Sequence, residues 1–584
     1  MNRTIPALVT ALLLAIVCTT ASAACDVSWR FTPRMTGPSR HIDAEVTWRA
    51  GNSRTTELAL TREWGGVDTF TKAMRDFRTR SAHQWVVDRA DPARKIVTHL
   101  PRERVTVTYR IDASPADPDS DPISRRDVYR VILGPDWFHF IGYAVFAVPS
   151  SFNDDTRPRM CVTVQATADD DWIVSSFGAR RARSVTYALR DSPDRLRHAV
   201  YFGGKFDVRQ REVRGRSIWV ARRGPWQFDM DAYADAVTRL VATHRTFWND
   251  FEYPPFAIEL LPTHQPVGGA GGTALRNAFV MYAPDDLKVP GEKFEFIIAH
   301  EYLHTWIPGR FGSMGEDEAQ RYWFSEGFTD FYTHRLLVRA GVWTFDQYAR
   351  SLNRKIEQYL QSDVRAYDNE RVKADFFSDT SVGALAYQRG ELLALRWHAK
   401  LSERTADGLD AVMRSLLLPQ SVEEEAKPPS PLATTRLLDA LDTERLSVAH
   451  ADVERYVEHG ELFTFDTETL GPCFEMHRDD KPAMTIGFDR RSVKEGRLVG
   501  VDVYGPAYAA GLREGQLISG FWLFEGDVSK DAGVQLRDGE GKTSEVTYRP
   551  ISRGRRSIPV YAPKPDAATD PACRRWFGLD VAAR

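Results

Sequence analysis

The sequence has 584 residues and a formal net charge of −3 at pH 7; 43% of its residues are hydrophobic and 27% are charged. A chain of this length exceeds what one hydrophobic core organises, so we expect about three or four domains. The balance of acids and bases and the absence of a long basic stripe argue against nucleic-acid binding. The ordinary composition argues against both a disordered chain and a membrane-embedded bundle.

The N-terminal residues have the features of a secretory signal peptide. Arg3 supplies a positive charge, residues 8–17 form a short apolar stretch, and residues 21–23 read Ala-Ser-Ala, a signal for cleavage. We therefore expect residues 1–23 to be removed on export to the periplasm or the medium. A retained anchor is the alternative, but the apolar stretch is too short to span a bilayer, and no later segment is apolar enough. Lipid anchoring at Cys25 is not expected, because a serine stands where a lipobox has an aliphatic residue.

Four cysteines remain in the mature chain: Cys25, Cys161, Cys473 and Cys573. An oxidising compartment favours disulfides, and four cysteines allow three pairings. Their positions, two early and two late, favour Cys25–Cys161 and Cys473–Cys573, with free buried thiols as the alternative. None has the Cys-x-x-Cys spacing of a zinc site, so cysteine ligation of zinc is not expected.

Residues 24–225 are predicted to form a β-rich domain. Apolar and polar residues alternate in period two over residues 104–110, 128–132 and 161–164, which is typical of half-buried strands. The turn-rich residues 114–122 separate such runs. We predict an all-β sandwich or saddle that carries no catalytic cluster and supports the domain that follows.

The pattern changes at the start of a second domain, which is predicted to span residues 226–468. Helical spacing over residues 230–248 is followed by a strand pattern at residues 256–261. The glycine-rich segment that comes next lacks the lysine of a P-loop, so it is not expected to cradle phosphate. Gly271 and Gly272 instead indicate an edge strand that holds a substrate backbone, with a flexible loop as the alternative.

The segment that organises the chain reads His-Glu-Tyr-Leu-His at residues 300–304. On a helix His300 and His304 project from one face, so their ring nitrogens can reach one cation roughly 2.0–2.1 Å away. Glu301 points beside this cation, where it can take a proton from an attacking water molecule. Histidines at this spacing are also common on polar surfaces, so a zinc site needs a third ligand.

Glu326, in the later segment Trp-Phe-Ser-Glu-Gly-Phe-Thr-Asp, is the predicted third zinc ligand. Asp330 lies one turn further along and is predicted to bind the second ring nitrogen of a ligand histidine, which would fix the ring. Together these parts predict a hydrolase site with one zinc ion per chain.

Helical patterns follow at residues 345–359, 386–401, 409–418 and 432–459. Residues 419–431, rich in proline and acidic residues, are predicted to form a surface loop. A strand-bearing half joined to a helix-rich half is how thermolysin-like α+β catalytic domains are built. We predict that fold for residues 226–468.

The last domain, predicted to span residues 469–584, resembles a PDZ domain. An expected strand at residues 498–504 leads into a small-residue turn, a short helix and a glycine, as in PDZ domains. Ile486, Gly487 and Phe488 stand where PDZ domains have a loop whose backbone N–H groups capture a peptide C-terminus. A PDZ-shaped domain that only packs on the catalytic body is the alternative.

With these motifs, the whole mature chain resembles the glycyl aminopeptidase family of gluzincin zinc metallopeptidases. The resemblance implies zinc ligation by His300, His304 and Glu326 and general-base catalysis by Glu301. It also implies that Tyr387, in Ala-Tyr-Gln-Arg-Gly, hydrogen-bonds the oxyanion, although arginine replaces the lysine of the family's motif. A buried structural tyrosine is the alternative.

Two departures from the family pattern concern the substrate. The family has a glutamate after its paired glycines that binds the free amino group, and Ala274 stands at this position here. The residues that follow the zinc histidines also differ, reading Trp-Ile-Pro-Gly-Arg from residue 306. Without its carboxylate partner, an ammonium group loses a charge-assisted bond worth about 1.5–3 kcal/mol. Aminopeptidase and endopeptidase action therefore both remain open.

The sequence thus predicts an exported, aminopeptidase-like zinc metallopeptidase that acts on peptides or proteins. An endopeptidase of the same fold is one alternative, and a PDZ-bearing peptide-binding protein with a non-catalytic zinc site is another. Hydrolysis of a non-peptide substrate is a third, because the motifs define the bond-breaking apparatus rather than the substrate. A nucleic-acid partner is not expected, nor is a transmembrane segment after removal of the signal peptide.

Overall fold

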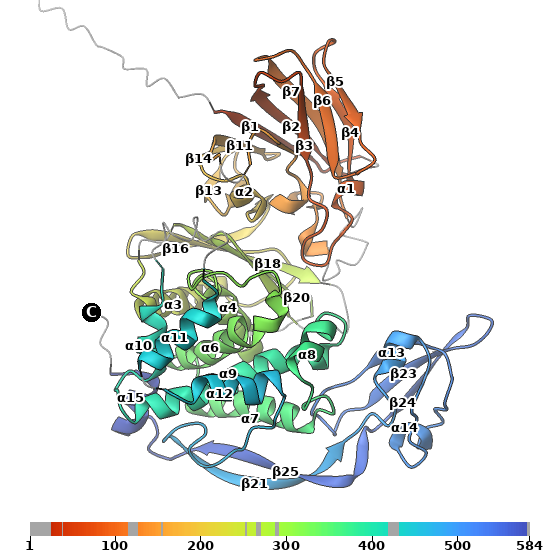
Figure 1. Ribbon diagram of the computed structural model, residues 1–584. Helices are drawn as coiled ribbons and strands as arrows, with labels where there is room; N and C mark the ends of the chain where they lie inside the picture. Colours follow the sequence, from red (N-terminus) through yellow and green to blue (C-terminus); the bar gives the residue numbers. More distant parts are fainter. Residues whose placement is uncertain are drawn as a thin grey trace, which may run out of the picture.

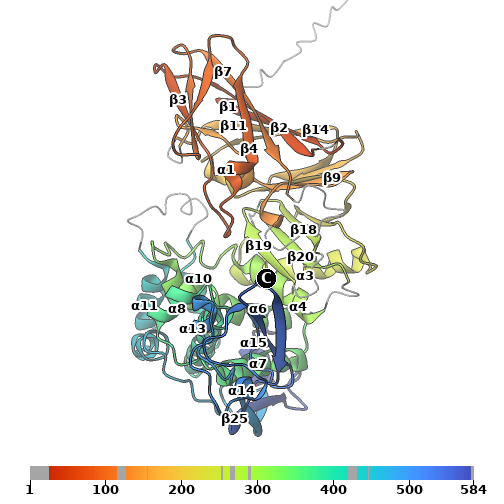
Figure 2. The ribbon, with the colours of Figure 1, turned by 90° about the vertical axis from the view of Figure 1, so that its right-hand side faces the viewer.

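The computed structural model describes residues 25–580 except 38, 115–126, 154–155, 252–253, 264–269, 287–290, 419–430 and 445. The predicted signal peptide and most of the turn-rich and proline-rich segments lie outside the described residues. A β-rich part lies at one end of the molecule, a helical part in the middle, and a small C-terminal module beside the helices (Figures 1 and 2). Among the described residues, no helix combines the length and the apolar character that crossing a membrane requires.

The N-terminal part is β-rich, as predicted, and contains three sheets. The six-stranded sheet has the order β14 (Ser184–Arg190), β11 (Arg159–Gln165), β1 (Val27–Arg34), β2 (His41–Arg49), β7 (Arg104–Asp112), β4 (Met74–Thr79). The four-stranded sheet has the order β10 (Val148–Pro149), β3 (Thr55–Ala59), β6 (Arg94–Thr98), β5 (Trp85–Asp88). The five-stranded sheet has the order β13 (Gly178–Arg181), β12 (Trp172–Ser175), β15 (Val200–Gly204), β9 (Trp137–Ile141), β8 (Ile132–Leu133). Short helical turns in the connections are α1 (Phe70–Ala73), η1 (Asp127–Tyr129), η2 (Gly142–Ala144) and α2 (Asp194–Arg197).

The two predicted disulfides have different outcomes. Cys25 and Cys161 are bonded, with Cα atoms 5.9 Å apart, and join the start of β1 to β11. Cys473 and Cys573 are free, buried thiols, so the prediction of a bond between them is wrong. Their side chains interact within an apolar core, where burial raises the pKa of both thiols. Burial thus favours the neutral thiol over the thiolate from which a disulfide forms.

The helical part begins with a five-stranded mixed sheet. Its order is β16 (Asp207–Val213), β17 (Arg216–Arg222), β18 (Phe256–Thr263), β20 (Ala278–Pro284), β19 (Gly271–Leu275). β17, β18 and β20 are parallel, and β19 is an antiparallel strand at the edge. The predicted helix at residues 230–248 is α3 (Met230–Trp248), which connects β17 to β18. β16 and β17 pair into the same sheet as β18. The sheet therefore begins at residue 207, before the domain boundary predicted at residue 226.

The central strands β18 and β20 of this sheet are buried on both faces, as parallel strands usually are. In β18, Ile258 and Leu260 belong to the apolar core shared with the helices. Ala257 and Leu261 belong instead to the core of the N-terminal part. Successive residues therefore face opposite ways, and the sheet joins the two parts of the molecule.

The predicted helical patterns are confirmed as a bundle that covers one face of the sheet (Figure 1). Its helices are α4 (Glu292–Leu303), α5 (Tyr322–Ser325), α6 (Gly327–Arg339), α7 (Phe345–Gln361), α8 (Asn369–Asp375), α9 (Thr380–Ser402), α10 (Leu409–Ser415), α11 (Ala433–Thr443) and α12 (Ala449–Asp452). Two further turns are η3 (Glu318–Arg321) and η4 (Val453–Glu458). All but one of the residues of α6 are buried, so this helix lies at the centre of the bundle.

The chain leaves the bundle in a long antiparallel ribbon of β21 (Phe474–Met484) and β25 (Ile551–Pro563) (Figure 1). Between these strands lies the C-terminal module, with the sheet β22 (Ile518–Trp522), β23 (Ala532–Arg537), β24 (Thr543–Tyr548) and the short helices α13 (Arg491–Glu495) and α14 (Pro506–Ala509). After the ribbon, α15 (Pro571–Phe577) packs against the bundle, where Phe577 lies 4.9 Å from the Tyr348 ring.

The C-terminal module lacks one strand that was predicted for it. The predicted strand at residues 498–504 is irregular, because Gly500 has a positive φ of 65° and Glu514 accepts the N–H groups of Gly500 and Val501. The segment that follows Phe488 forms the short helix α13. Within the described residues the module therefore offers no strand edge beside Phe488 to which a peptide could add.

Candidate active site

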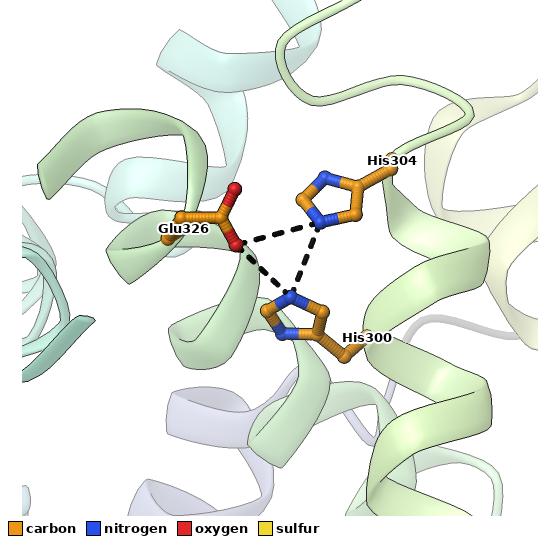
Figure 3. A group of neighbouring side chains, drawn as sticks. All are labelled: His300, His304 and Glu326. Atoms are coloured by element: carbon orange, nitrogen blue, oxygen red, sulfur yellow. Dashed lines mark hydrogen bonds and ion pairs between the residues drawn. The ribbon is translucent and has the colours of Figure 1, made fainter. Parts of the chain in front are cut away.

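α4 presents both predicted histidines toward Glu326, which precedes α6 (Figure 3). The Nε2 atoms of His300 and His304 are 3.1 Å apart, and Glu326 Oε2 lies 3.3 Å and 3.5 Å from them. A tetrahedral zinc ion with bonds of about 2.0–2.1 Å separates its ligands by roughly 3.3 Å. The three side chains therefore have the spacing that zinc requires. No other such group of ligands occurs in the described part of the chain.

The outer nitrogen of each histidine is held by a hydrogen bond. Nδ1 of His300 lies 2.7 Å from Asp330 Oδ1, as predicted, and Nδ1 of His304 donates to the Ile307 carbonyl at 2.8 Å. Each bond leaves the Nε2 atom facing Glu326. Such contacts fix the ring orientation and raise the basicity of a metal-binding histidine.

The carboxylates around the histidines favour a bound cation. Burial lowers the pKa of His300, but Asp330 and Glu326 outweigh this effect and raise it to about 10. Burial likewise raises the pKa of Glu326, but His304 and His300 lower it below its usual value, so Glu326 is ionised. An ionised carboxylate facing two imidazole rings is a donor set suited to zinc.

Glu301, the predicted general base, lies between this group and β19. Burial raises its pKa, while His304, His300 and a hydrogen-bonding interaction with the backbone of Ala274 oppose the rise. The interaction places β19 directly beside the base. Ala274 itself brings no charge to the site.

Tyr387 of α9 lies beside the predicted zinc ligand His300. Its ring centroid is 6.1 Å from that of His300, and the two ring planes differ by 27°. Burial, together with the negative charges of Glu326, Asp330 and Glu301, raises the pKa of Tyr387 well above its usual value. Its hydroxyl therefore keeps its proton and can donate to an oxyanion.

Arg389, which replaces the lysine of the resembled motif, is buried and binds backbone carbonyl groups. It is only 1% exposed, and its guanidinium donates to the backbone carbonyl groups of Arg365, at 3.0 Å, and Tyr367. Two helical positions correspond to about 200°, so Arg389 and Tyr387 occupy opposite faces of α9. Arg389 thus ties α9 to the loop before α8.

Gly271 and Gly272 lie on the predicted edge strand, β19. A Cβ atom on Gly271 would be 2.3 Å from the Tyr282 hydroxyl, and one on Gly272 would be 2.2 Å from the Phe279 ring. Packing against these two rings of β20 explains why both residues are glycine. In the described sheet, β20 occupies one edge of β19 and no strand occupies the other.

Behind Asp330 lies a buried group of charges that sequence reasoning missed. Lys355 of α7 contacts Asp330 Oδ2 and Glu391 Oε2, and Glu391 Oε1 lies 2.6 Å from His334 Nδ1. The side chains of Asp330, Glu391 and His334 are at most 5% exposed. One sequence signal existed, because Lys355 falls three residues after Leu352, on the apolar face of its helix.

The structure does not bring the predicted carboxylate-binding loop to the site. Ile486 and Phe488 are 2% and 7% exposed and belong to the separate core of the C-terminal module. The Ile486 carbonyl accepts a hydrogen bond from the Tyr548 hydroxyl at 2.7 Å, and the Gly487 N–H donates to Thr485 Oγ1 at 3.2 Å.

Residues 293–375, which include the three predicted zinc ligands, match the family model described as M61 glycyl aminopeptidase. Among solved structures, the aminopeptidase N family protein of Idiomarina loihiensis has a TM-score of 0.69 at 14% identity, covering 94% of this chain and 100% of that chain. The M1 zinc metallopeptidase of Deinococcus radiodurans has a TM-score of 0.45 at 16% identity, covering 75% of this chain and 94% of that chain. A search of curated proteins gave no match. The first of these structures shares the fold along nearly the whole chain.

Proposed function

We propose, on the premise that this chain is a zinc aminopeptidase-like enzyme of the M61 glycyl aminopeptidase type, that it hydrolyses peptide bonds with one zinc ion held by His300, His304 and Glu326. The observation that carries the proposal is the 3.1–3.5 Å spacing of the three ligand atoms, with Glu301 beside them. A purely structural zinc site would require neither Glu301 nor Tyr387.

The surrounding residues supply the steps of the reaction. His300, His304 and Glu326 would hold the zinc ion, which when bound would supply polarisation of the scissile carbonyl group and acidification of the attacking water. Glu301 takes a proton from that water and passes it to the leaving amine. The Tyr387 hydroxyl donates a hydrogen bond to the developing oxyanion, and the free edge of β19 binds the extended substrate backbone.

The test of this function is Glu301→Gln with zinc retained. Hydrolysis of a set of peptides should fall by about 10²–10⁴-fold, because the variant lacks the proton acceptor. Zinc content, measured by elemental analysis, should stay at one ion per chain. Undiminished hydrolysis by the variant, or no hydrolysis by the zinc-loaded wild type, would contradict the proposal.

We also propose that the protein is exported. The charged, apolar and Ala-Ser-Ala segments of residues 1–23 support this, as does the Cys25–Cys161 disulfide, since such bonds persist in oxidising compartments. Cell fractionation followed by N-terminal sequencing tests it; a mature chain that starts near residue 24 outside the cytoplasm is the expected result.

For the C-terminal module we propose packing on the catalytic body rather than peptide capture. Arg490, before α13, is bound to Asp363 at 2.8 Å, to Asp379 at 3.2 Å and to Glu525 at 2.9 Å. Asp379 caps the start of α9, the helix that carries Tyr387. Titration with C-terminal peptides should show no binding to the module.

A further inference from the structure

Phe377, in the turn between α8 and α9, is 84% exposed, more than any other large apolar side chain among the described residues. A single exposed apolar residue is ordinary on a protein surface. Phe377 differs in two respects. It stands at the end of a series of aromatic rings that begins beside the zinc ligands, and its backbone is held in place.

The aromatic row, formed by Tyr387, Phe376, Tyr322 and Phe377, is continuous. The Tyr387 ring lies 6.1 Å from that of His300, and the Phe376 ring lies 6.5 Å from Tyr387 with 15° between the planes. The Phe377 ring is edge-on to Phe376 at 4.9 Å and to Tyr322 at 6.3 Å. These spacings are those of interacting aromatic pairs. Tyr322, Phe376 and Tyr387 are half-buried, so each keeps part of its surface accessible.

The turn that carries Phe377 is fixed by both neighbouring helices. The Asp379 N–H donates to the Asp375 carbonyl at 2.9 Å. In the first turn of α9, a Cβ atom on Gly383 would be 2.7 Å from the Phe376 carbonyl oxygen, so glycine lets the turn approach the helix closely. Phe377 is therefore presented to solvent on a hydrogen-bonded support. An aromatic side chain held in this way loses little conformational entropy when it binds a partner.

The charges next to Phe377 do not favour a basic ligand. Asp379 caps α9 and is bound by Arg490 at 3.2 Å. Asp375 lies 3.9 Å from Lys494. Both acids of this turn thus face basic groups, so the end of the aromatic row offers an apolar surface rather than a negative one.

We propose that Phe377 and the aromatic row form a subsite for an apolar, above all aromatic, side chain of the peptide substrate; this inference rests on the proposed peptidase function. Contact between Phe377 and such a side chain removes apolar surface from water and adds the attraction of an aromatic pair.

The position of Phe377 determines which substrate residue it binds. The rings of Tyr387 and Phe376 separate it from His300. Because an extended peptide advances about 3.3–3.6 Å per residue, the bound side chain belongs to a residue about two or three positions from the cleaved bond. Derivatives of single amino acids are too short to reach this subsite.

The experiment compares wild type, Phe377→Ala and Phe377→Trp on an alanine hexapeptide and on a series in which one phenylalanine occupies each position in turn. A second series carries lysine instead, and mass spectrometry identifies the cleaved bond. Wild type should favour phenylalanine about two or three residues from that bond. Phe377→Ala should lower kcat/KM for these peptides about 5- to 20-fold, mainly through KM, and leave the all-alanine peptide unchanged. Phe377→Trp should keep the preference.

Trp85→Ala is the control, because it removes another exposed aromatic side chain, 53% exposed, from β5 in the N-terminal part (Figure 1). It should match wild type on every peptide. Equal melting temperatures should show that all the variants are folded, since Phe377 contributes little buried surface.

Other results would overturn the inference. If wild type gains nothing from phenylalanine at any position, or gains as much from lysine, Phe377 binds no apolar side chain and the peptidase function stands. The same holds if Phe377→Ala slows every peptide equally or none. If zinc-loaded wild type cleaves none of the peptides, the peptidase function fails, and the inference fails with it.

Discussion

Gly327 of α6 lies directly against Gly390 of α9. A Cβ atom on Gly327 would be 2.4 Å from the Gly390 Cα, and one on Gly390 would be 1.7 Å from the Trp323 carbonyl oxygen. Gly327 follows the zinc ligand Glu326, and Gly390 comes one helical turn after Tyr387. The contact between the two glycines therefore sets the distance between a zinc ligand and the proposed oxyanion donor.

Gly390→Ala should separate the two helices. Overpacking of this kind costs about 1–3 kcal/mol in the free energy of unfolding, and a shift of Tyr387 should lower kcat more than KM. Urea denaturation and peptide hydrolysis measure the two effects. Gly51→Ala is the control, because no atom lies within 4 Å of the Cβ it would add. A fully active, fully stable Gly390→Ala protein would show that the contact can relax.

Lys355→Met should weaken both the fold and the zinc site. Removing one partner of a buried ion pair costs about 3–5 kcal/mol, because Asp330 and Glu391 would be left as uncompensated charges. Zinc affinity, measured by competition with a chelator, should fall about 10- to 100-fold, because Asp330, the partner of His300, is no longer held in place by Lys355. Lys373→Met, which breaks an exposed pair with Asp317, should cost less than about 1 kcal/mol.

A double variant tests whether uncompensated charge causes the losses of stability and zinc affinity expected for Lys355→Met. Adding Glu391→Gln to Lys355→Met removes one of the two uncompensated carboxylates, so part of the lost stability and zinc affinity should return. Strictly additive losses would instead point to packing alone.

Acidification should destabilise the protein through His398. Burial and then the charge of Arg335 lower its pKa from 6.5 to about 3, and its Nδ1 accepts the Leu409 N–H at 3.2 Å. Between these two pH values the unfolded state binds a proton that the folded state does not. The free energy of unfolding therefore falls as the pH drops below 6.5, by at most about 1.4 kcal/mol per pH unit from this group. Urea denaturation at pH 7, 6 and 5 measures the slope, which His398→Gln should reduce.

Removal of zinc should lower the melting temperature as well as the activity. A ligand that binds only the folded state stabilises it, by about 4 kcal/mol when present at 1,000 times its Kd. Thermal denaturation with chelator, and then with zinc restored, measures this effect. Glu326→Gln should give a much smaller zinc-dependent shift, and an equal shift in that variant would exclude Glu326 as a ligand.

The local features of the fold and the site could be predicted from the sequence. α3 has the predicted bounds, and helical spacing indicated that His300 shares a face with His304 and that Glu326 shares one with Asp330. That these two faces meet was expected from the zinc motif and the family resemblance, not from spacing. Long-range features could not be predicted. Lys355 reaches Asp330 only because α6 and α7 pack together, and the Ile307 carbonyl carries no side-chain signal.

The C-terminal module shows where local pattern was misleading. The apolar residues at 498–504 alternate as in a strand. Gly500, however, has a positive φ that turns the backbone, and the N–H groups of Gly500 and Val501 donate to the Glu514 carboxylate instead of to a neighbouring strand. The Cys473 and Cys573 thiols were also predicted to form a disulfide, since the sequence shows which cysteines exist and not that both are buried as free thiols.

The position of α15 has a consequence for truncated forms of the protein. The carbonyl of Trp576 accepts from the buried Arg335 of α6 at 2.5 Å, and the Phe577 ring packs on Tyr348 of α7. These residues follow the C-terminal module in the chain, yet they complete the bundle that holds the predicted zinc ligands. A chain that lacks α15 cannot close this core, so we expect a variant truncated before Pro571 to lose hydrolytic activity even though all predicted catalytic residues are present.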